Sequence, residues 1–184
     1  MRVVSGTARG CKLEAPDGLS TRPTADRIRE TLFNIIAADL PGCVFLDVFS
    51  GTGAVAIEAL SRGADEAVLI DSNPSCAKYI TRNLAHCSVS ERARLITKDY
   101  TEALASLQAA YNNKFDFIFM DPPYHKNFTA RALELAAPLL ADGGKIIAEV
   151  GAKEEAPVVP GLTLYREKKF AAATLLFYRK EEIL

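Results

Sequence analysis

Short apolar runs alternate with one-sided helical patterns along most of this 184-residue chain. Five apolar runs predict buried strands, at residues 44–47, 66–71, 93–98, 115–120 and 145–150. Helical spacing of apolar residues follows four of them, and predicts helices from the Gly-rich turn through Arg62, from Pro74 onward, at residues 101–110 and at residues 128–140. Strands that are apolar throughout and joined by helices are typical of a parallel sheet covered on both faces.

The two ends of the chain depart from this alternation. Residues 162–169 and 174–178 predict a terminal hairpin, because no helical pattern separates them. Residues 2–4 and 11–13 predict a small N-terminal hairpin, and a helix follows it with Thr24 as its N-cap. We therefore expect one α/β domain over residues 1–184, with an N-terminal extension at 1–41 and a core at 42–184.

Composition narrows the class of protein. The chain is 49% hydrophobic and carries a formal charge of -1, which excludes a strongly basic nucleic-acid binder but permits a local basic patch. It has no apolar run long enough to span a membrane and no signal-peptide pattern at Met1, so we expect a cytoplasmic protein. No surplus amphipathic helix or coiled-coil pattern remains once the core is assigned, so we also expect a monomer. The four cysteines show no metal-ligand spacing, which predicts reduced, structural thiols and no metal.

A glycine-rich turn, Asp47-Val48-Phe49-Ser50-Gly51-Thr52-Gly53, joins the first core strand to its helix. Ligands of such sheets bind beyond the carboxyl ends of the strands, and glycines let the backbone approach them closely. Asp71 ends the next strand, where a carboxylate can accept the hydroxyls of a ribose. The spacing Gly51, Gly53, Ala56 also fits a dinucleotide site or a turn without any ligand.

The acidic residues favour one cofactor. Asp47 would repel a pyrophosphate but attract the ammonium and sulfonium groups of S-adenosylmethionine. Asp99 ends the third strand and can accept a hydrogen bond from an adenine amine, although Asp71 and Asp99 could instead cap the helices that follow. The predicted cofactor site consists of Asp47, Phe49, Gly51, Gly53, Asp71 and Asp99.

The fourth strand ends in Asp121-Pro122-Pro123-Tyr124. The exocyclic amine of a nucleobase is a poor nucleophile, because its lone pair is delocalised into the ring. Two acceptors, the Asp121 carboxylate and the Pro122 carbonyl, can hold its two N–H groups and localise the lone pair. The prolines, Pro122 and Pro123, fix the turn and remove competing donors, and Tyr124 can stack on a flipped base. A rigid turn with a surface tyrosine is the alternative.

These motifs, taken in order, resemble the class I (Rossmann-like) methyltransferases that modify exocyclic amines of nucleobases. The front of the chain, with Arg2-Val3-Val4-Ser5-Gly6 and the segment from Thr21-Arg22-Pro23-Thr24 to Asn34, resembles the bacterial RsmD family. That resemblance implies methyl transfer to N2 of a specific guanine in 16S ribosomal RNA. It also implies a seven-stranded, mostly parallel sheet with an antiparallel C-terminal hairpin strand. A Tyr-Gly pair is expected near Phe170-Ala171, where this chain departs from the family.

The N-terminal segment also carries candidate RNA contacts. Arg22 and Arg27 are the cations we expect to bind the phosphate backbone, with Tyr124 against the target base. The near-neutral charge suggests recognition of the shape of an assembled or assembling 30S subunit rather than of naked RNA. Three alternatives remain: a DNA or RNA adenine-N6 methyltransferase, a nicotinamide oxidoreductase, and a non-catalytic RNA-binding protein.

Overall fold

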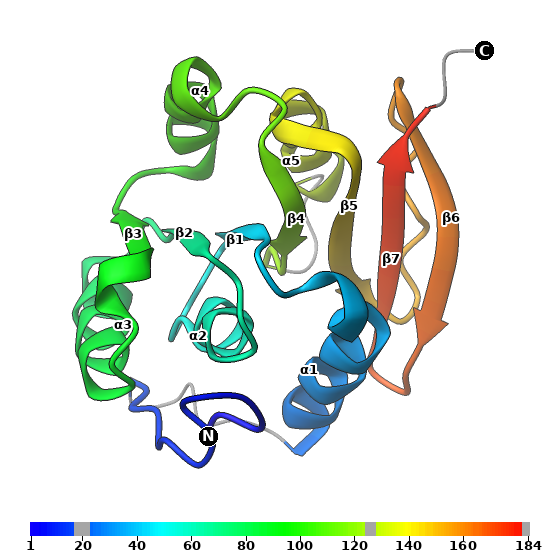
Figure 1. Cartoon of the computed structure of the whole chain (residues 1–184). Helices are drawn as coiled ribbons and strands as arrows, with labels where there is room; N and C mark the ends of the chain where they lie inside the picture. Colours follow the sequence, from blue (N-terminus) through cyan, green and yellow to red (C-terminus); the bar gives the residue numbers. More distant parts are fainter. Residues whose placement is uncertain (17–22, 124–127, 182–184) are drawn as a thin grey trace.

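A seven-stranded sheet forms the centre of the structure, with helices on both of its faces (Figure 1). The computed structural model describes residues 1–16, 23–123 and 128–181. The strands are β1 (Val44–Val48), β2 (Glu66–Ile70), β3 (Ala93–Ile96), β4 (Phe115–Met120), β5 (Leu140–Gly151), β6 (Leu162–Lys169) and β7 (Ala173–Lys180). Their order is β3-β2-β1-β4-β5-β7-β6, and only β7 runs antiparallel to its neighbours. The predicted fold class is thereby confirmed.

Helices cover each face of the sheet. The main ones are α1 (Pro23–Ile36), α2 (Ala54–Ser61), α3 (Pro74–His86), α4 (Tyr100–Tyr111) and α5 (Phe128–Ala136), with short 3-10 helices at Ala37–Asp39, Ser90–Arg92 and Ala137–Leu139. The first three lie on one face and α4 and α5 on the other (Figure 1). Among the described residues, no helix is both long enough and apolar enough to cross a bilayer.

The strand β4 shows why the sheet is buried on both sides. Successive side chains of a strand point to opposite faces. Phe117 and Phe119 therefore join the core beneath α1, α2 and α3, whereas Ile118 and Met120 join the core beneath α4 and α5. Both cores exclude water, and five of the six residues of the strand are apolar. The exception, Asp116, accepts a hydrogen bond from the Val44 N–H at 2.8 Å.

The N-terminal hairpin is anchored on α2 by a buried carboxylate. Arg2 and Lys12 form an antiparallel bridge, which confirms the predicted hairpin. Glu58, which is only 1% exposed, accepts hydrogen bonds from the backbone N–H groups of Val4 and Ser5 at 2.8 and 3.0 Å. The Arg62 guanidinium lies 2.7 Å from the same carboxylate and balances its charge.

Several predicted boundaries are wrong; the third strand, for example, ends at Ile96 rather than at residue 98. The helix α1 begins at Pro23, so Thr24 lies inside its first turn and is not the N-cap. The fifth strand begins at Leu140 rather than at residue 145, because the preceding helix ends at Ala136. Pro138 explains the early end, since proline lacks an N–H and its ring clashes with the carbonyl four residues earlier. At the C-terminal hairpin, where the Tyr-Gly pair is missing, the Phe170 N–H donates to the Ala173 carbonyl and closes the turn.

The cysteine prediction is wrong for two of the four residues. Cys11 of the N-terminal hairpin and Cys87, at the end of α3, form a disulfide with their Cα atoms 5.9 Å apart. Cys43 and Cys76 are buried free thiols, as predicted. The pairing was hidden in the sequence because 76 positions separate the two cysteines, and only the packing of the hairpin near α3 brings them together.

Cys11→Ser is expected to lower the free energy of unfolding by about 2–4 kcal/mol in non-reducing buffer, because the cross-link restricts the unfolded chain. Urea unfolding measures this, and dithiothreitol should bring the wild type down to the stability of the variant. Equal wild-type stability with and without the reductant would contradict the disulfide.

Candidate active site

The carboxyl ends of β1, β2, β3 and β4 meet around a cavity of about 480 Å³. Parallel strands that end at one edge of a sheet bring the residues that follow them together. Seven of the residues singled out in the sequence line this cavity: Phe49, Gly51, Asp71, Asp99, Asp121, Pro122 and Pro123. The structure therefore assembles the glycine-rich turn, two of the three acidic residues of the predicted cofactor site, and the Asp-Pro-Pro turn at one place.

Asp71 connects the glycine-rich turn to the end of β2. Its Oδ2 atom accepts a hydrogen bond from the Gly51 N–H at 2.8 Å, and its Oδ1 atom accepts one from the Asn73 N–H at 2.8 Å. A carboxylate oxygen can accept more than one hydrogen bond. Asp71 can thus hold the turn in place and still offer acceptor capacity to a ligand with hydroxyl groups.

The two glycines of the turn have different surroundings. Both have positive φ angles, 57° for Gly51 and 77° for Gly53, which other residues rarely adopt. A Cβ atom at Gly53 would lie 3.2 Å from Leu69 and 3.5 Å from Ile80, whereas a Cβ atom at Gly51 would have no neighbour within 4 Å. Gly53 is therefore required by packing, and Gly51 leaves open space beside the backbone that a ligand can fill.

Asp99 caps α4 and also lines the cavity. Its Oδ1 atom accepts hydrogen bonds from the Thr101 N–H at 2.9 Å and from the Thr101 hydroxyl at 2.5 Å. The helix-cap alternative for Asp99 is thus confirmed. Asp71, by contrast, does not cap α3, because that cap is Asn73. Capping does not exclude ligand binding by Asp99, which stays a prediction.

An aromatic wall closes one side of the cavity. The rings of Phe49 and Tyr100 have their centroids 5.1 Å apart, and those of Tyr100 and Phe128 are 5.9 Å apart. Phe49 holds a left-handed backbone conformation with φ 67°, a strained state for a residue with a large side chain. The predicted site included neither Tyr100 nor Phe128. Their positions directly after the third strand and after the Asp-Pro-Pro-Tyr turn were the available signal.

Asp47 lies beneath the cavity instead of lining it. Its side chain is 1% exposed, and its carboxylate accepts a hydrogen bond from the Ala56 N–H at 3.2 Å. Burial, together with the charges of Asp121 and Asp71, raises the pKa of Asp47 to about 8. Asp47 is therefore mostly protonated at neutral pH when no cation is nearby, and its predicted contact with the cofactor stays a prediction.

Asp121 and Glu149 follow paired residues of neighbouring strands. Met120 of β4 is in register with Ala148 of β5, so the next residue of each strand lies at the same rim. Asp121 faces the cavity, but the protein packed around its carboxyl group and the charge of Glu149 raise its pKa to about 7. A carboxyl group with this pKa can both accept a hydrogen bond and take up a proton near neutral pH.

The structure does not test the predicted roles of three RNA-contact or catalytic residues. Arg22 and Tyr124 lie outside the described residues. Arg27 is exposed on α1, and it is not among the residues that line the cavity. All three roles stay predictions.

The donor and acceptor set of the cavity favours one kind of ligand. Three carboxylates, those of Asp71, Asp99 and Asp121, face it together with the aromatic wall. Carboxylates accept hydrogen bonds from hydroxyls and amines and attract cations, and aromatic rings pack on flat heterocycles. The cavity therefore suits a cationic ligand that carries hydroxyl groups and a planar ring.

The strand order and the cavity at the carboxyl ends of β1–β4 define an α/β protein with the methyltransferase fold. The family comparison is more specific. Residues 1–179 match the model of the family described as conserved hypothetical protein 95, and the chain belongs to that family.

Similar proteins carry names of related activities. The chain is 34% identical to ribosomal RNA small subunit methyltransferase D of Escherichia coli, over 98% of this chain and 90% of that protein. A solved structure of a candidate methyltransferase from the same species, YhhF, superposes with a TM-score of 0.86 at 34% identity and covers 98% of both chains. A hypothetical protein of Thermus thermophilus superposes with a TM-score of 0.81 at 28% identity, over 96% of this chain and 98% of that one.

Gly51→Ala and Gly53→Ala form a matched pair. Both substitutions place an alanine at positive φ, which costs about 1–2 kcal/mol. Gly53→Ala should destabilise the protein further, by about 1–3 kcal/mol, because it overpacks the contact with Leu69. Urea unfolding measures both variants, and equal losses would show that the space beside Gly51 is not open.

Proposed function

We propose that this protein transfers a methyl group from S-adenosylmethionine to the exocyclic N2 of a guanine in 16S ribosomal RNA. The observation that carries the proposal is the cavity in which Asp121 and the two prolines after β4 lie beside the acidic residues that end β2 and precede α4. Membership of the family, and the name of its Escherichia coli relative, support RNA of the small ribosomal subunit as the substrate.

The cavity fits S-adenosylmethionine by its chemistry. The open space beside Gly51 can receive the part of the ligand that lies against the turn. Asp71 would accept the ribose hydroxyls and Asp99 the adenine amine, with Phe49 and Tyr100 against the adenine ring. When bound, the cofactor supplies a methyl group made electrophilic by its sulfonium. Asp47 would contribute negative charge from beneath the turn, since a nearby cation lowers the pKa of a carboxyl group.

Asp121 and Pro122 would act on the target amine. The carboxylate of Asp121 and the carbonyl of Pro122 would each accept one N–H of the guanine amine and so localise its lone pair. Pro122 is buried and neither proline has an N–H, so no donor of their own competes for these acceptors. As the C–N bond forms, the methyl–sulfur bond would break and leave a neutral thioether. The methylated N2 would then release one proton, which Asp121 can take because its pKa lies near 7.

Substrate recognition would extend beyond the cavity. Tyr124 would stack on the guanine, and Arg22 and Arg27 would contact phosphates, since a guanidinium can bind two phosphate oxygens at once and Arg27 is exposed on α1. We further propose that the substrate is the assembled or assembling 30S subunit. A formal charge of -1 gives little general attraction for naked RNA.

A methyl-transfer assay with four acceptors tests the function. Labelled S-adenosylmethionine is offered with 30S subunits that lack the modification, with protein-free 16S rRNA, with duplex DNA and with no acceptor. N2-methylguanosine formed on the subunit is the expected product. Methyladenine would overturn the substrate assignment in favour of an adenine-N6 enzyme. No transfer to any acceptor, despite cofactor binding, would contradict the proposed reaction.

Asp121→Ala should lower the rate of methyl transfer by about 100-fold or more, because it removes an acceptor used in the transition state. Calorimetry should find cofactor binding nearly unchanged. Asp65→Asn removes an exposed carboxylate that follows α2, outside the cavity, and serves as the matched control with wild-type activity. Loss of cofactor binding in Asp121→Ala, in parallel with the rate, would show a structural role instead.

The rate of methyl transfer should depend on pH through Asp121. Its pKa is raised to about 7, so lowering the pH through 7 protonates the carboxylate and removes the acceptor. We expect kcat/KM for the RNA to fall as the pH drops below 7, with an apparent pKa that Asp121 shares with Glu149 and with Asp47, whose pKa of about 8 is raised in part by the charge of Asp121. The variants His86→Gln and His125→Gln, which remove the two histidines of the chain, are the controls. A profile abolished by either would refute the assignment.

A further inference from the structure

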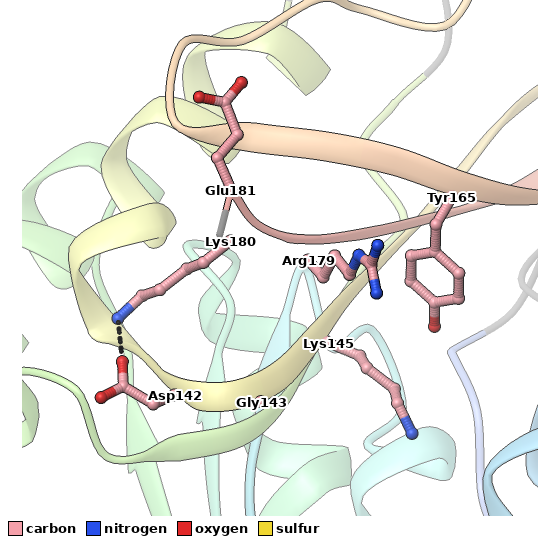
Figure 2. Close-up of a pocket in the computed structure, with 7 residues that line it drawn as sticks. All are labelled: Asp142, Gly143, Lys145, Tyr165, Arg179, Lys180 and Glu181. Carbon is pink, nitrogen blue, oxygen red and sulfur yellow. Dashed lines mark hydrogen bonds and ion pairs between the residues drawn. The ribbon is translucent and has the colours of Figure 1, made fainter. Parts of the chain in front are cut away.

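A second cavity lies at the other end of the sheet, with a volume of about 600 Å³ (Figure 2). It is formed where β5 begins and β7 ends, with β6 beside them, and its lining includes Lys145, Tyr165, Arg179 and Lys180. Lys145 is in register with Phe117 of β4, four residues before Asp121, which corresponds to about 13 Å along the strand. This cavity is therefore separate from the candidate active site.

A β-bulge shapes the wall of this cavity. Leu164 of β6 pairs with Tyr178 of β7, and Arg166 pairs with Phe177, so Tyr165 is an extra residue between two pairs. Successive side chains of a regular strand point to opposite faces. Here both Tyr165 and Arg166 contact Phe177, with ring centroids 6.3 Å apart and the guanidinium carbon 5.6 Å from the centroid. The bulge thus turns an aromatic ring and a cation to the same face.

Tyr165 is one of two large apolar or aromatic side chains that the described part of the chain exposes. It is 40% exposed, although the guanidinium of Arg179 lies over its ring at 5.8 Å from the centroid. Figure 2 shows the Arg179 side chain beside the ring and Lys145 on the same side of the cavity. Part of a ring held between a guanidinium and a buried phenylalanine therefore remains open to a partner.

Cations outnumber carboxylates around the ring. The charged groups that act on the Tyr165 hydroxyl are the cations Lys145, Arg166 and Arg179 and the carboxylate of Asp39. Lys145 is held by an ion pair with Asp39 and lies over the Phe117 ring at 5.5 Å. At the far rim, which Asp142 and Glu181 also line, Figure 2 shows Lys180 held by Asp142. The Lys180 ammonium also donates a hydrogen bond to Asn113. The whole chain carries a charge of -1, so this local excess of positive charge is a distinct feature.

We propose that this cavity is a second RNA-contact site, in which an unpaired nucleotide stacks on Tyr165 and its flanking phosphates bind Lys145, Arg166 and Arg179. Aromatic rings interleaved with cations are the elements that bind single-stranded nucleic acid. Guanidinium groups suit phosphates because they bind two oxygens at once and also stack on rings. The inference rests on the proposed function, since it assigns the nucleotide to the same ribosomal RNA that carries the target guanine.

The separation of the two sites determines what the second one can do. Side chains about 13 Å or more from Asp121 cannot touch the reacting amine. Tyr165 and its cations would therefore hold the RNA and set its affinity, while the bound complex reacts at the usual rate. Substitutions here should raise KM for the RNA and leave kcat and cofactor affinity unchanged.

The first test compares charge variants. Arg166→Gln/Arg179→Gln is measured against Lys78→Gln, which removes an exposed cation on α3, near the opposite edge of the sheet. Affinity for protein-free 16S rRNA and for 30S subunits is recorded at several salt concentrations. Loss of two phosphate contacts should make the salt dependence shallower by about 1.4 in log–log slope for the double variant. The single Lys78→Gln variant should match the wild type.

The second test compares two substitutions of the aromatic ring. Tyr165→Leu should weaken RNA binding roughly 5- to 100-fold, the scale of one lost base–aromatic stack, whereas Tyr165→Phe should bind as the wild type does. Thermal unfolding of each variant confirms that it folds, and methyl transfer at saturating RNA should proceed at the wild-type kcat.

Three results would overturn the inference. One is unchanged affinity and salt dependence in all variants, while the wild type methylates the subunit. Another is weaker binding to the subunit with wild-type binding to protein-free rRNA, because a ribosomal protein would then be the partner. The third is competition by free uridine monophosphate at micromolar concentration, which would identify a small nucleotide as the ligand. Failure of the wild type to transfer methyl groups would refute the proposed function. The binding measurements would still test the second RNA-contact site independently.

Discussion

The carboxylate of Asp71 holds together the parts on which the candidate active site depends. It accepts hydrogen bonds from Gly51, 20 positions earlier in the turn after β1, and from Asn73 ahead of α3, and so links the ends of the first two strands. The turn fixed in this way contains Phe49 in its strained conformation and leaves open space beside Gly51. Without these hydrogen bonds, β1 and β2 would still end at the same rim of the sheet. The glycine-rich turn that faces the ligand, however, would lack a defined shape.

Much of the fold follows from local pattern, and the misses have physical causes. The bounds of β4 were predicted correctly because five of its six residues belong to one core or the other, which gives an apolar run interrupted only by Asp116. The start of β5 was missed because Pro138 ends the helix before it, and the Cys11–Cys87 disulfide because it depends on tertiary packing alone. For the site, residues directly after strands were found. Asp47 was placed at the rim, whereas burial puts it beneath, because a sequence gives no depth.

The acidic residues around the cavity destabilise the protein when no ligand is bound. Asp47 and Asp121 have raised pKa values, since burial disfavours their charged forms and Asp71 and Glu149 add repulsion. A bound cation would relieve this repulsion. Part of the selectivity for a cationic cofactor would therefore come from the electrostatic repulsion among carboxylates in the ligand-free protein. The same crowding makes proton uptake by Asp121 possible near neutral pH. Binding and chemistry are thus two consequences of one concentration of carboxylates.

The bulge in β6 has a second consequence, which concerns the border of the sheet. Unpaired strands at a border can join the backbone of another molecule and start aggregation. The chain limits this at both borders: β3 spans only four residues, Ala93–Ile96, and β6 is interrupted at Tyr165 and ends in the exposed Lys168 and Lys169. A straight, neutral β6 would offer eight residues for such pairing. Removing the extra residue of β6 would therefore lower the solubility of the protein before it destabilised the fold.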